Sequence, residues 1–220
     1  MKEVIMKKSL FWLALMVGIV ALIGSCAKKD ENTATTAATS CATDTTASGS
    51  ITVGSETLSG VYISECNTTQ FAAAAGSSLF PSDVKSGKTT IVVTSDTTLT
   101  EELLMYTDTS CSTPTAYTKN DETSVTVGVA SGSNYLVTYA SSTYKVQADT
   151  TVAETHLEAF LLAATGSAVD LTVGTEHSMS GSGNTYKNVW SVTSTTIQTG
   201  EEEDNGTQPT EMDSMVMTKE

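Results

Sequence analysis

From residue 51 onward, short runs of β-branched residues alternate with clusters of glycine, serine, asparagine and aspartate. Branched side chains pack well on a pleated surface, and the polar clusters between the runs are typical of turns. This pattern predicts strands over residues 58–65, 89–94, 99–107, 124–130, 135–140, 143–148, 168–173, 185–199 and 212–218. Residues 99–107 also suit a helix, but the turn expected just before them, at Ser95 and Asp96, favours a strand. The number and spacing of these runs predict a mainly β domain, built as a sandwich or a barrel.

One helix is expected to interrupt the strands. The stretch from Thr151 to Glu154 matches a capping box, in which two side chains satisfy free amides at a helix start. Apolar residues then recur at helical spacing, at Leu157, Phe160, Leu161 and Ala164. Gly166 can end this helix, because glycine readily adopts the left-handed conformation that commonly terminates helices.

The first 25 residues have the layout of a secretion signal. Lys7 and Lys8 precede an apolar run over residues 10–23, and small residues follow that run. The run has 14 residues, whereas a membrane-spanning helix needs about 20. We therefore expect this segment to be a cleaved signal rather than a permanent membrane span.

The apolar run ends in Ile23, Gly24 and Ser25, which lead directly into Cys26. This ending resembles the lipobox of bacterial lipoproteins. The resemblance implies that Cys26 becomes the lipid-modified first residue of the mature chain, so that a membrane is the partner of its N-terminus. Lipoproteins kept at the inner membrane often carry aspartate directly after this cysteine. Ala27 stands there in this chain, which favours the outer membrane of the cell envelope.

Residues 26–50 are rich in threonine, alanine and serine and contain no bulky apolar side chain. Such a segment cannot bury enough surface to offset the entropy lost on ordering. We expect a flexible tether there. The chain thus divides into a signal peptide at residues 1–25, a lipidated tether at residues 26–50 and one β domain at residues 51–220.

The chain is acidic, with a formal net charge of −14 at pH 7, and it contains no arginine. Affinity for nucleic acids depends largely on cationic side chains placed against phosphates. A nucleic-acid partner is therefore not expected. The acidic charge mainly favours solubility.

The cysteines after Cys26 are Cys41, Cys66 and Cys111. Outside the cytoplasm such residues tend to oxidise in pairs. Cys66 and Cys111 each follow a predicted strand, and a bridge between them would close a loop of about 46 residues, worth roughly 4 kcal/mol in the chain-entropy model. This pair is favoured. A Cys41–Cys66 bridge is the alternative, and the remaining thiol would stay free or pair between molecules.

Two stretches resemble small lipocalin-like lipoproteins of bacteria. Residues 60–66, Gly-Val-Tyr-Ile-Ser-Glu-Cys, are similar to the opening strand of those proteins, and residues 106–111 are similar to a later Tyr-x-Asp-x-x-Cys motif. The resemblance implies a single antiparallel β-barrel, paired cysteines and no assigned activity. Tyr62 stands where tryptophan is more typical, and the arginine that lipocalins place near the end is absent. The resemblance therefore indicates a fold more than a ligand.

Candidate catalytic and metal-binding groups are few. Residues 87–89, Gly-Lys-Thr, match the end of a phosphate-binding loop, but Ser82 stands where that motif needs glycine, and a predicted strand follows. His156 and His177 lie beside glutamates, yet their spacing supplies too few ligands for a metal site.

Two further clusters have ordinary explanations. Met212, Met215 and Met217 carry soft thioethers of the kind that favour Cu(I), but alternate residues of a final strand explain them as well. The Glu-Glu-Glu-Asp run at residues 201–204 suits calcium, but it lacks the spaced oxygens of an EF-hand loop. No catalytic residue, metal site or cofactor is predicted.

These features favour a lipid-anchored envelope protein of non-catalytic type. Its expected partner is a small apolar ligand in the barrel mouth or another envelope protein. The alternative is a surface adhesion or assembly module with an immunoglobulin-like β-sandwich, and a hydrolase or metal-handling enzyme ranks third. Strand order separates the first two, because a closed meander favours the former and a two-sheet Greek key the latter. The sequence leaves the oligomeric state open.

Overall fold

The computed structural model describes residues 45–78, 80–201 and 207–220. Cys26, Cys41 and the predicted signal segment lie outside the described residues, as do residues 202–206 of the predicted acidic loop. Within the described part of the chain, no helix has the length and apolar character needed to cross a membrane.

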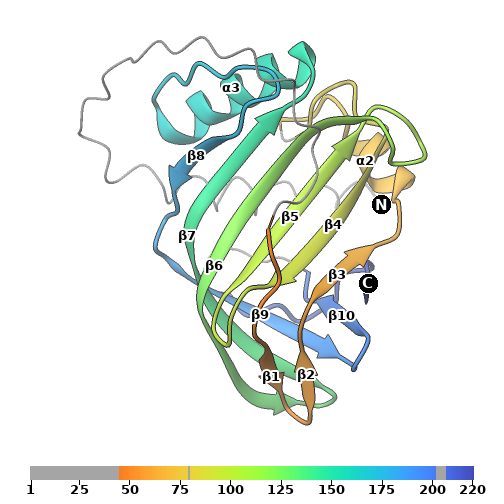
Figure 1. The fold of residues 1–220 in the computed structure, drawn as a ribbon, viewed down its shortest axis with the longest axis vertical. Helices are drawn as coiled ribbons and strands as arrows, with labels where there is room; N and C mark the ends of the chain where they lie inside the picture. Colours follow the sequence, from red (N-terminus) through yellow and green to blue (C-terminus); the bar gives the residue numbers. More distant parts are fainter. Residues whose placement is uncertain (1–44, 79, 202–206) are drawn as a thin grey trace.

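Eight strands form a closed antiparallel barrel (Figure 1). They are β3 (Val61–Ser64), β4 (Ser86–Val93), β5 (Leu99–Tyr106), β6 (Pro114–Ser131), β7 (Asn134–Ala148), β9 (Thr185–Val192), β10 (Thr196–Thr199) and β11 (Met217–Lys219). Each strand pairs with the next in this order, and β11 pairs with β3 to close the ring. This closed meander confirms the predicted lipocalin-like barrel and differs from the two-sheet Greek key of the alternative.

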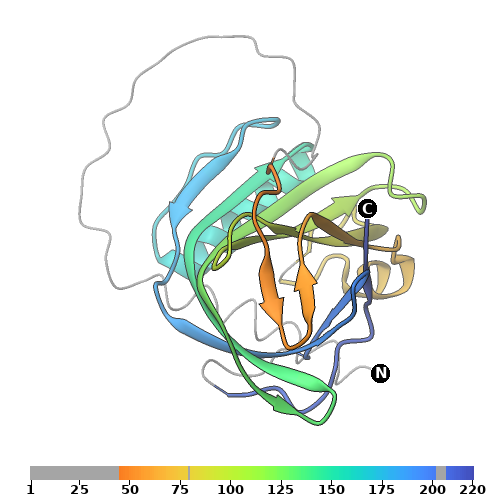
Figure 2. The same cartoon turned by 60° about the horizontal axis from the view of Figure 1, so that its bottom comes forward.

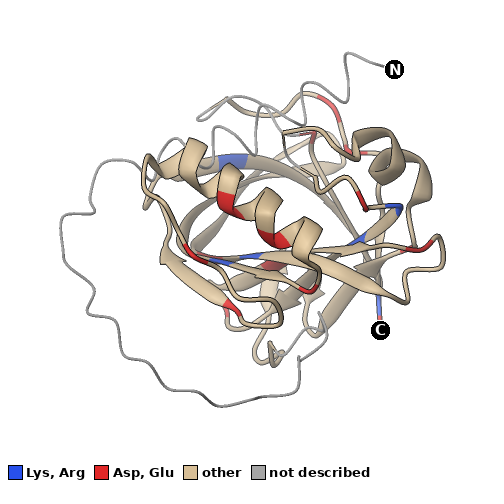
Figure 3. Ribbon diagram, turned by 90° about the horizontal axis from the view of Figure 1, so that it is seen from above, with Lys and Arg blue, Asp and Glu red and all other residues tan. Residues whose placement is uncertain are grey.

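The two ends of the barrel are covered by different elements. A hairpin of β1 (Ile51–Val53) and β2 (Glu56–Leu58) crosses one end, as Figure 2 shows. The helix α3 (Thr151–Thr165) lies over the other end (Figure 3), where α2 (Thr68–Ala74) also contacts β4. The short strand β8 (His177–Ser180) pairs with the part of β7 that β9 does not reach.

Two apolar cores fill the barrel, one beneath each cover. The hairpin-end core consists of Ile51, Val53, Leu58, Tyr62, Ile91, Val93, Leu99, Val125, Val137, Tyr139, Tyr186, Trp190, Ile197 and Met217. The helix-end core consists of Phe71, Val84, Met105, Ala116, Tyr144, Val146, Ala148, Ala153, Leu157, Phe160, Leu161, Ala164 and Leu171. The apolar stripe of α3 thus packs against inward residues of the barrel, as the helical spacing predicted.

The start of α3 differs from the prediction by one residue. Thr150, not Thr151, caps the helix, and its hydroxyl accepts a hydrogen bond from the amide of Ala153 at 3.1 Å. Thr150 has the extended backbone that a capping residue requires, whereas Thr151 is already helical and exposed. The helix ends at Gly166, whose left-handed conformation, with φ of 70°, confirms the predicted end.

Several predicted strands have other bounds. The prediction over residues 58–65 is interrupted at Gly60, whose φ of +89° breaks the chain between β2 and β3. Residues 135–140 and 143–148 belong to one strand, β7, and residues 185–199 form two strands joined by a turn at Thr193, whose amide donates to Thr196. Residues 124–130 are only the final part of β6, which begins at Pro114.

Two predictions near the C-terminal half are wrong. Residues 168–173 form no strand. Leu171 packs into the helix-end core, and its amide donates to the Glu158 carboxylate rather than to the carbonyl of a neighbouring strand. Of residues 212–218, only Met217 and Thr218 are in a strand, because the Asp213 carboxylate accepts from the Met215 amide and holds a local turn. The sequence reading also missed α2, β1 and β8. The helix α2 begins at an Asn67 cap that accepts from the Gln70 amide.

The last residues of the predicted tether contact the barrel. The amide of Ser48 donates to the carbonyl of Val93 at 2.9 Å, and its hydroxyl donates to the carbonyl of Thr94 at 2.6 Å. The chain therefore meets the barrel wall before β1 begins.

Candidate binding site inside the barrel

Polar side chains lie inside the barrel between the two apolar cores. On β5, the inward positions are Leu99, Glu101, Leu103 and Met105, because side chains alternate across a strand. Leu99 belongs to the hairpin-end core, and Leu103 and Met105 pack in the helix-end core. Glu101 therefore faces the interior at the level where the two cores meet.

The neighbouring strands β6 and β7 add further polar groups at this level. Thr118, Asn120 and Glu122 of β6 stand opposite the inward residues of β5, so they also face the interior. Asn120 stands in turn opposite Tyr144 of β7, which packs in the helix-end core. We call this set the polar belt; its members are Glu101, Thr118, Asn120, Glu122 and Tyr144.

Burial changes the protonation of both belt glutamates. It raises the pKa of Glu101 to about 7, and the nearby negative charge of Asp213 adds to this rise. Burial likewise raises the pKa of Glu122 to about 8, with further contributions from the charges of Glu101 and Asp121. At neutral pH the belt therefore holds at least one carboxyl group in its protonated, neutral form.

The ion pairs of the described residues lie outside the barrel. Lys119 lies 3.9 Å from Glu102 and 3.6 Å from Glu176, and Lys145 lies 3.4 Å from Asp121. These residues of β5 and β6 alternate with belt residues and so face away from the interior. None of these described pairs includes a belt glutamate.

Four buried oxygen atoms of the belt have no hydrogen-bond partner among the described residues, and two of them are the hydroxyls of Thr118 and Tyr144. The other two are Oδ1 of Asn120 and Oε2 of Glu122, and each of these two residues is only 3% exposed. Leaving a buried polar group without a partner costs about 1–3 kcal/mol. The belt is therefore a place where the fold presents polar groups to the interior whose hydrogen-bonding capacity is not met within the described residues.

A small cavity adjoins the belt beneath α3. Its lining residues are Phe80, Leu103, Met105, Thr118, Tyr144, Leu157 and Phe160.

 The volume of this cavity, about 20 Å³, is enough for one water-sized group. Pockets for drug-sized ligands have about 300–1,000 Å³, so an apolar ligand of that size does not fit here.

A larger hollow lies on the outer side of the same strands. It has a volume of about 430 Å³ and is lined by Thr45, Thr94, Thr98, Leu99, Thr100, Asp121, Glu122, Thr123 and Lys145. Its polar groups bond to one another, since the Thr100 hydroxyl donates to Asp121 at 2.9 Å and Asp121 pairs with Lys145. Glu122, a belt residue, also lines this hollow.

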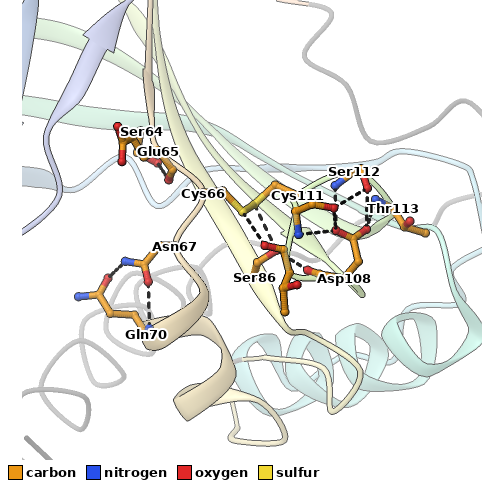
Figure 4. The surroundings of a disulfide bond; sticks show 12 residues. Ser64, Glu65, Cys66, Asn67, Gln70, Ser86, Asp108, Cys111, Ser112 and Thr113 are labelled. Carbon is orange, nitrogen blue, oxygen red and sulfur yellow. Dashed lines mark hydrogen bonds between the residues drawn. A yellow bond between two sulfur atoms is a disulfide. The ribbon is translucent and has the colours of Figure 1, made fainter.

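The favoured disulfide, Cys66–Cys111, is present, with the two Cα atoms 5.8 Å apart (Figure 4). It joins the chain after β3 to the loop between β5 and β6. In that loop the carboxylate of Asp108 accepts hydrogen bonds from the amides of Ser110 and Thr113 and from the Ser110 hydroxyl. These bonds, the Ser110 hydroxyl first among them, hold the pKa of Asp108 well below its usual range. The disulfide thus fastens an ordered loop and lies apart from the belt.

The two histidines occupy separate elements. His156 lies on α3, and His177 lies on β8, where it stands opposite Val146 of β7. Across residues 45–78, 80–201 and 207–220, no group of three or more histidine, cysteine or acidic side chains is placed to hold a metal ion.

The three methionines near the C-terminus contact different parts of the barrel. Met217 is buried in the hairpin-end core. The sulfur of Met215 accepts from the Thr89 hydroxyl at 3.9 Å, and the sulfur of Met212 accepts from the Asn134 amide at 3.4 Å. The structure therefore places each sulfur against a different protein group.

The Gly-Lys-Thr stretch at residues 87–89 lies within β4. A Cβ atom at Gly87 would overlap the ring of Phe71, so glycine is needed there to let α2 pack against the barrel. Close packing explains this glycine.

The sequence alone does not identify the belt residues as a site. A signal for one of them is present on β5, where Glu101 interrupts an alternation of apolar residues at Leu99, Leu103 and Met105. On β6 the inward residues are all polar over Thr118 to Glu122, so no alternation marks that strand as part of a core.

The fold and the belt carry the functional argument, because comparison with known proteins adds no family. No protein-family model matches the chain, and a search of curated proteins finds no significant similarity to it.

Proposed function

We propose that the protein is a lipid-anchored, non-catalytic binding protein of the cell envelope that holds a small ligand at the polar belt. One observation carries the binding role. Oδ1 of Asn120 and Oε2 of Glu122 are buried inside the barrel without hydrogen-bond partners among the described residues. A ligand that donates hydrogen bonds to these atoms would remove the cost of leaving them unmet.

The surroundings of the belt set the size of this ligand. Both ends of the barrel are filled by their own apolar side chains, and the cavity beside Thr118 and Tyr144 is about 20 Å³. Barrels of eight strands have interiors that their side chains fill or that hold one small ligand. The apolar part of the ligand is therefore short and would contact the apolar lining of this cavity.

Two observations support the cellular address. Residues 23–26 resemble a lipobox, although they lie outside the described residues. The Cys66–Cys111 disulfide is of the kind that persists in oxidising compartments, such as a cell envelope. Both are consistent with export and anchoring through Cys26.

Metabolic labelling tests the anchor. Bacteria expressing the full chain are grown with an alkyne-bearing fatty acid, and the labelled protein is followed in membrane and soluble fractions. We expect label and membrane association in the parent and in Cys41→Ser, and loss of both in Cys26→Ser. Retention of label by Cys26→Ser would contradict anchoring through Cys26.

Mass spectrometry of released small molecules tests the ligand. The full chain is purified in neutral detergent and then denatured, and the released compounds are compared among the parent, Glu122→Gln and Glu65→Gln. Glu65 is exposed on the chain after β3 and serves as the matched control. We expect one compound in near-stoichiometric amount from the parent and the control, and much less from Glu122→Gln. No retained compound in any sample would contradict the ligand.

A further inference from the structure

The polar belt contains two acidic side chains and no basic one. The belt presents two carboxyl groups, Glu101 and Glu122, together with the carbonyl oxygen of Asn120. Asp213 lies close enough to raise the pKa of Glu101, and no described ion pair reaches either belt glutamate. A group that brings positive charge and hydrogen-bond donors would therefore pair with these oxygen atoms, and the hydroxyls of Thr118 and Tyr144 can also accept from it.

We propose that the polar belt binds a small primary ammonium compound. This inference rests on the proposed function and names the class of its ligand. An ammonium group has three donors and no acceptor, which matches Oδ1 of Asn120, Oε2 of Glu122 and a carboxylate oxygen of Glu101. Hydrogen bonds between charged groups are shorter and stronger than neutral ones.

The aromatic neighbours of the belt suit the same ligand. Tyr144 is a belt member, and Tyr186 lies near enough for the charge of Glu122 to raise its pKa, although burial is the larger cause. The Tyr186 ring lies beside that of Tyr139, with centroids 6.0 Å apart. Aromatic faces attract cations within about 6 Å of the ring centre, so these rings would favour an ammonium group over a neutral donor.

A metal ion fits the belt less well than an organic cation. Among the described residues, no group of three or more histidine, cysteine or acidic side chains is placed for a metal. Calcium takes six to eight oxygen ligands, whereas the belt offers two carboxyl groups and one amide oxygen. An ammonium group needs only three acceptors.

Solvent has access to one side of the belt. Glu101 keeps part of its surface exposed, unlike Asn120 and Glu122. The charge of Asp213 reaches Glu101, and Asp213 and the half-exposed Met215 precede β11 in a segment that is not in a strand. A short ammonium compound would reach the belt past Asp213, whose negative charge would favour its approach.

Binding of the ammonium group has a proton balance. At pH 6 both belt glutamates are protonated, because the pKa values of Glu101 and Glu122 are about 7 and 8. A bound cation favours the carboxylate form, so each glutamate that pairs with it releases its proton to solvent. The alkylammonium itself stays charged over this range. Affinity therefore rises with pH, by up to about tenfold per pH unit for each proton released.

Calorimetry with ethylammonium chloride tests the proposal on the full chain in neutral detergent at constant ionic strength. We expect saturable one-to-one binding that is at least fivefold tighter at pH 8 than at pH 6, with heats that reveal proton release. Tetramethylammonium has the charge but no donors, and we expect at least tenfold weaker binding. Equal binding of the two cations, affinity independent of pH, or no binding of ethylammonium would overturn the proposal.

Two independent variants locate the site. Glutamine resembles the protonated acid, so Glu101→Gln and Glu122→Gln should fold at neutral pH, which circular dichroism verifies. We expect each to lose at least tenfold in affinity for ethylammonium and to release fewer protons, while Glu65→Gln binds as the parent does. Parent-like binding by both belt variants would place the cation elsewhere and contradict the inference.

A primary ammonium group can belong to a free amine or to the headgroup of an aminophospholipid. Competition distinguishes the two sources: free ethanolamine is compared with micelles that contain phosphatidylethanolamine or phosphatidylcholine. Displacement of ethylammonium by ethanolamine or by phosphatidylethanolamine supports the proposal and identifies the source, whereas displacement by neither contradicts it. If a compound without an amine co-purifies and ethylammonium does not bind, the amine inference fails and the binding role stands.

Discussion

The hairpin end of the barrel and its polar belt use the same strands in opposite ways. On β5, Leu99 is buried in the hairpin-end core, and two residues further along the same face Glu101 lies in the belt. The apolar residues at the hairpin end gain free energy on burial, about 25 cal/mol for each Å² removed from water. The buried acids of the belt lose free energy, because a carboxylate taken from water must be paired or must bind a proton.

This difference indicates that the belt, rather than the packed ends, is the functional part of the barrel. Residues that lower the stability of the fold, such as these buried acids, are expected at functional sites, and favourable packing elsewhere in the molecule offsets their cost. The two packed ends provide that compensation, and they hold the belt residues in place. The following experiments test the difference between the packed ends and the belt.

The largest loss is expected at the hairpin end. Trp190 is 2% exposed there, and we expect Trp190→Ala to lower the free energy of unfolding by about 3–5 kcal/mol through lost burial and a cavity. Urea unfolding followed by far-ultraviolet circular dichroism measures this change. Val129→Ala is the control, since Val129 is 73% exposed, and it should stay within about 0.5 kcal/mol. A similar loss in both variants would contradict the assignment of stability to this core.

The disulfide is the next largest contribution, and it acts outside both regions. Replacing Cys66 and Cys111 together with serine should lower the free energy of unfolding by roughly 4 kcal/mol, because the unfolded chain gains the entropy of an open loop. Unfolding of the parent with and without reductant gives an independent measure. Ethylammonium binding by the folded double variant should match the parent. A selective loss of that binding would connect the disulfide to the belt.

The belt should make stability depend on pH. The pKa of Glu122 is about 8 in the folded protein and near its ordinary value of 4.5 in the unfolded chain. The folded state therefore binds more protons between these values, and this contribution lowers stability as pH rises, by about 1 kcal/mol per pH unit. We expect Glu122→Gln to flatten the decline measured by urea unfolding between pH 5 and 8. An unchanged slope in this variant would show that Glu122 titrates normally.

The smallest effect is expected at the start of α3, which covers the helix-end core. Thr150→Ala removes the cap of this helix, and we expect a loss of about 1 kcal/mol in unfolding free energy. Thr151→Ala is the matched control, because its exposed side chain does not cap the helix. Thermal unfolding of the two variants compares them directly. A larger loss of unfolding free energy in Thr151→Ala would show that Thr151 caps the helix, as the sequence alone predicts.

The parts of the fold that could be predicted from the sequence are those with a local signal. Leu99, Leu103 and Met105 share one face at a period of two, which predicts β5. Apolar residues recur at helical spacing from Leu157 to Ala164, which predicts α3. The Cys66–Cys111 pair was favoured because each cysteine follows a strand. The bounds of α3 shifted by one residue, because Thr150 and Thr151 are equally able to cap and only the backbone conformation decides between them.

The remaining elements depend on contacts that no short window contains. The first part of β6 has polar residues on its inward face, at Thr118, Asn120 and Glu122, so its pairing with β5 is visible only in the assembled sheet. The alternation at residues 168–173 is misleading, since Leu171 is buried by a tertiary contact of a loop. The candidate site was missed for the same reason as β6, because both consist of polar residues that the barrel encloses.

The closure of β11 on β3 has a consequence for the order of folding. The three residues of β11, which follow every other barrel strand in the chain, form the last segment of the wall and join it to the first strand. A nascent chain can pair β3 through β7 as successive hairpins, but the ring stays open until β11 has emerged. Enclosure of the interior, together with any molecule trapped in it, therefore waits for contacts between the two barrel strands that are most distant in the sequence.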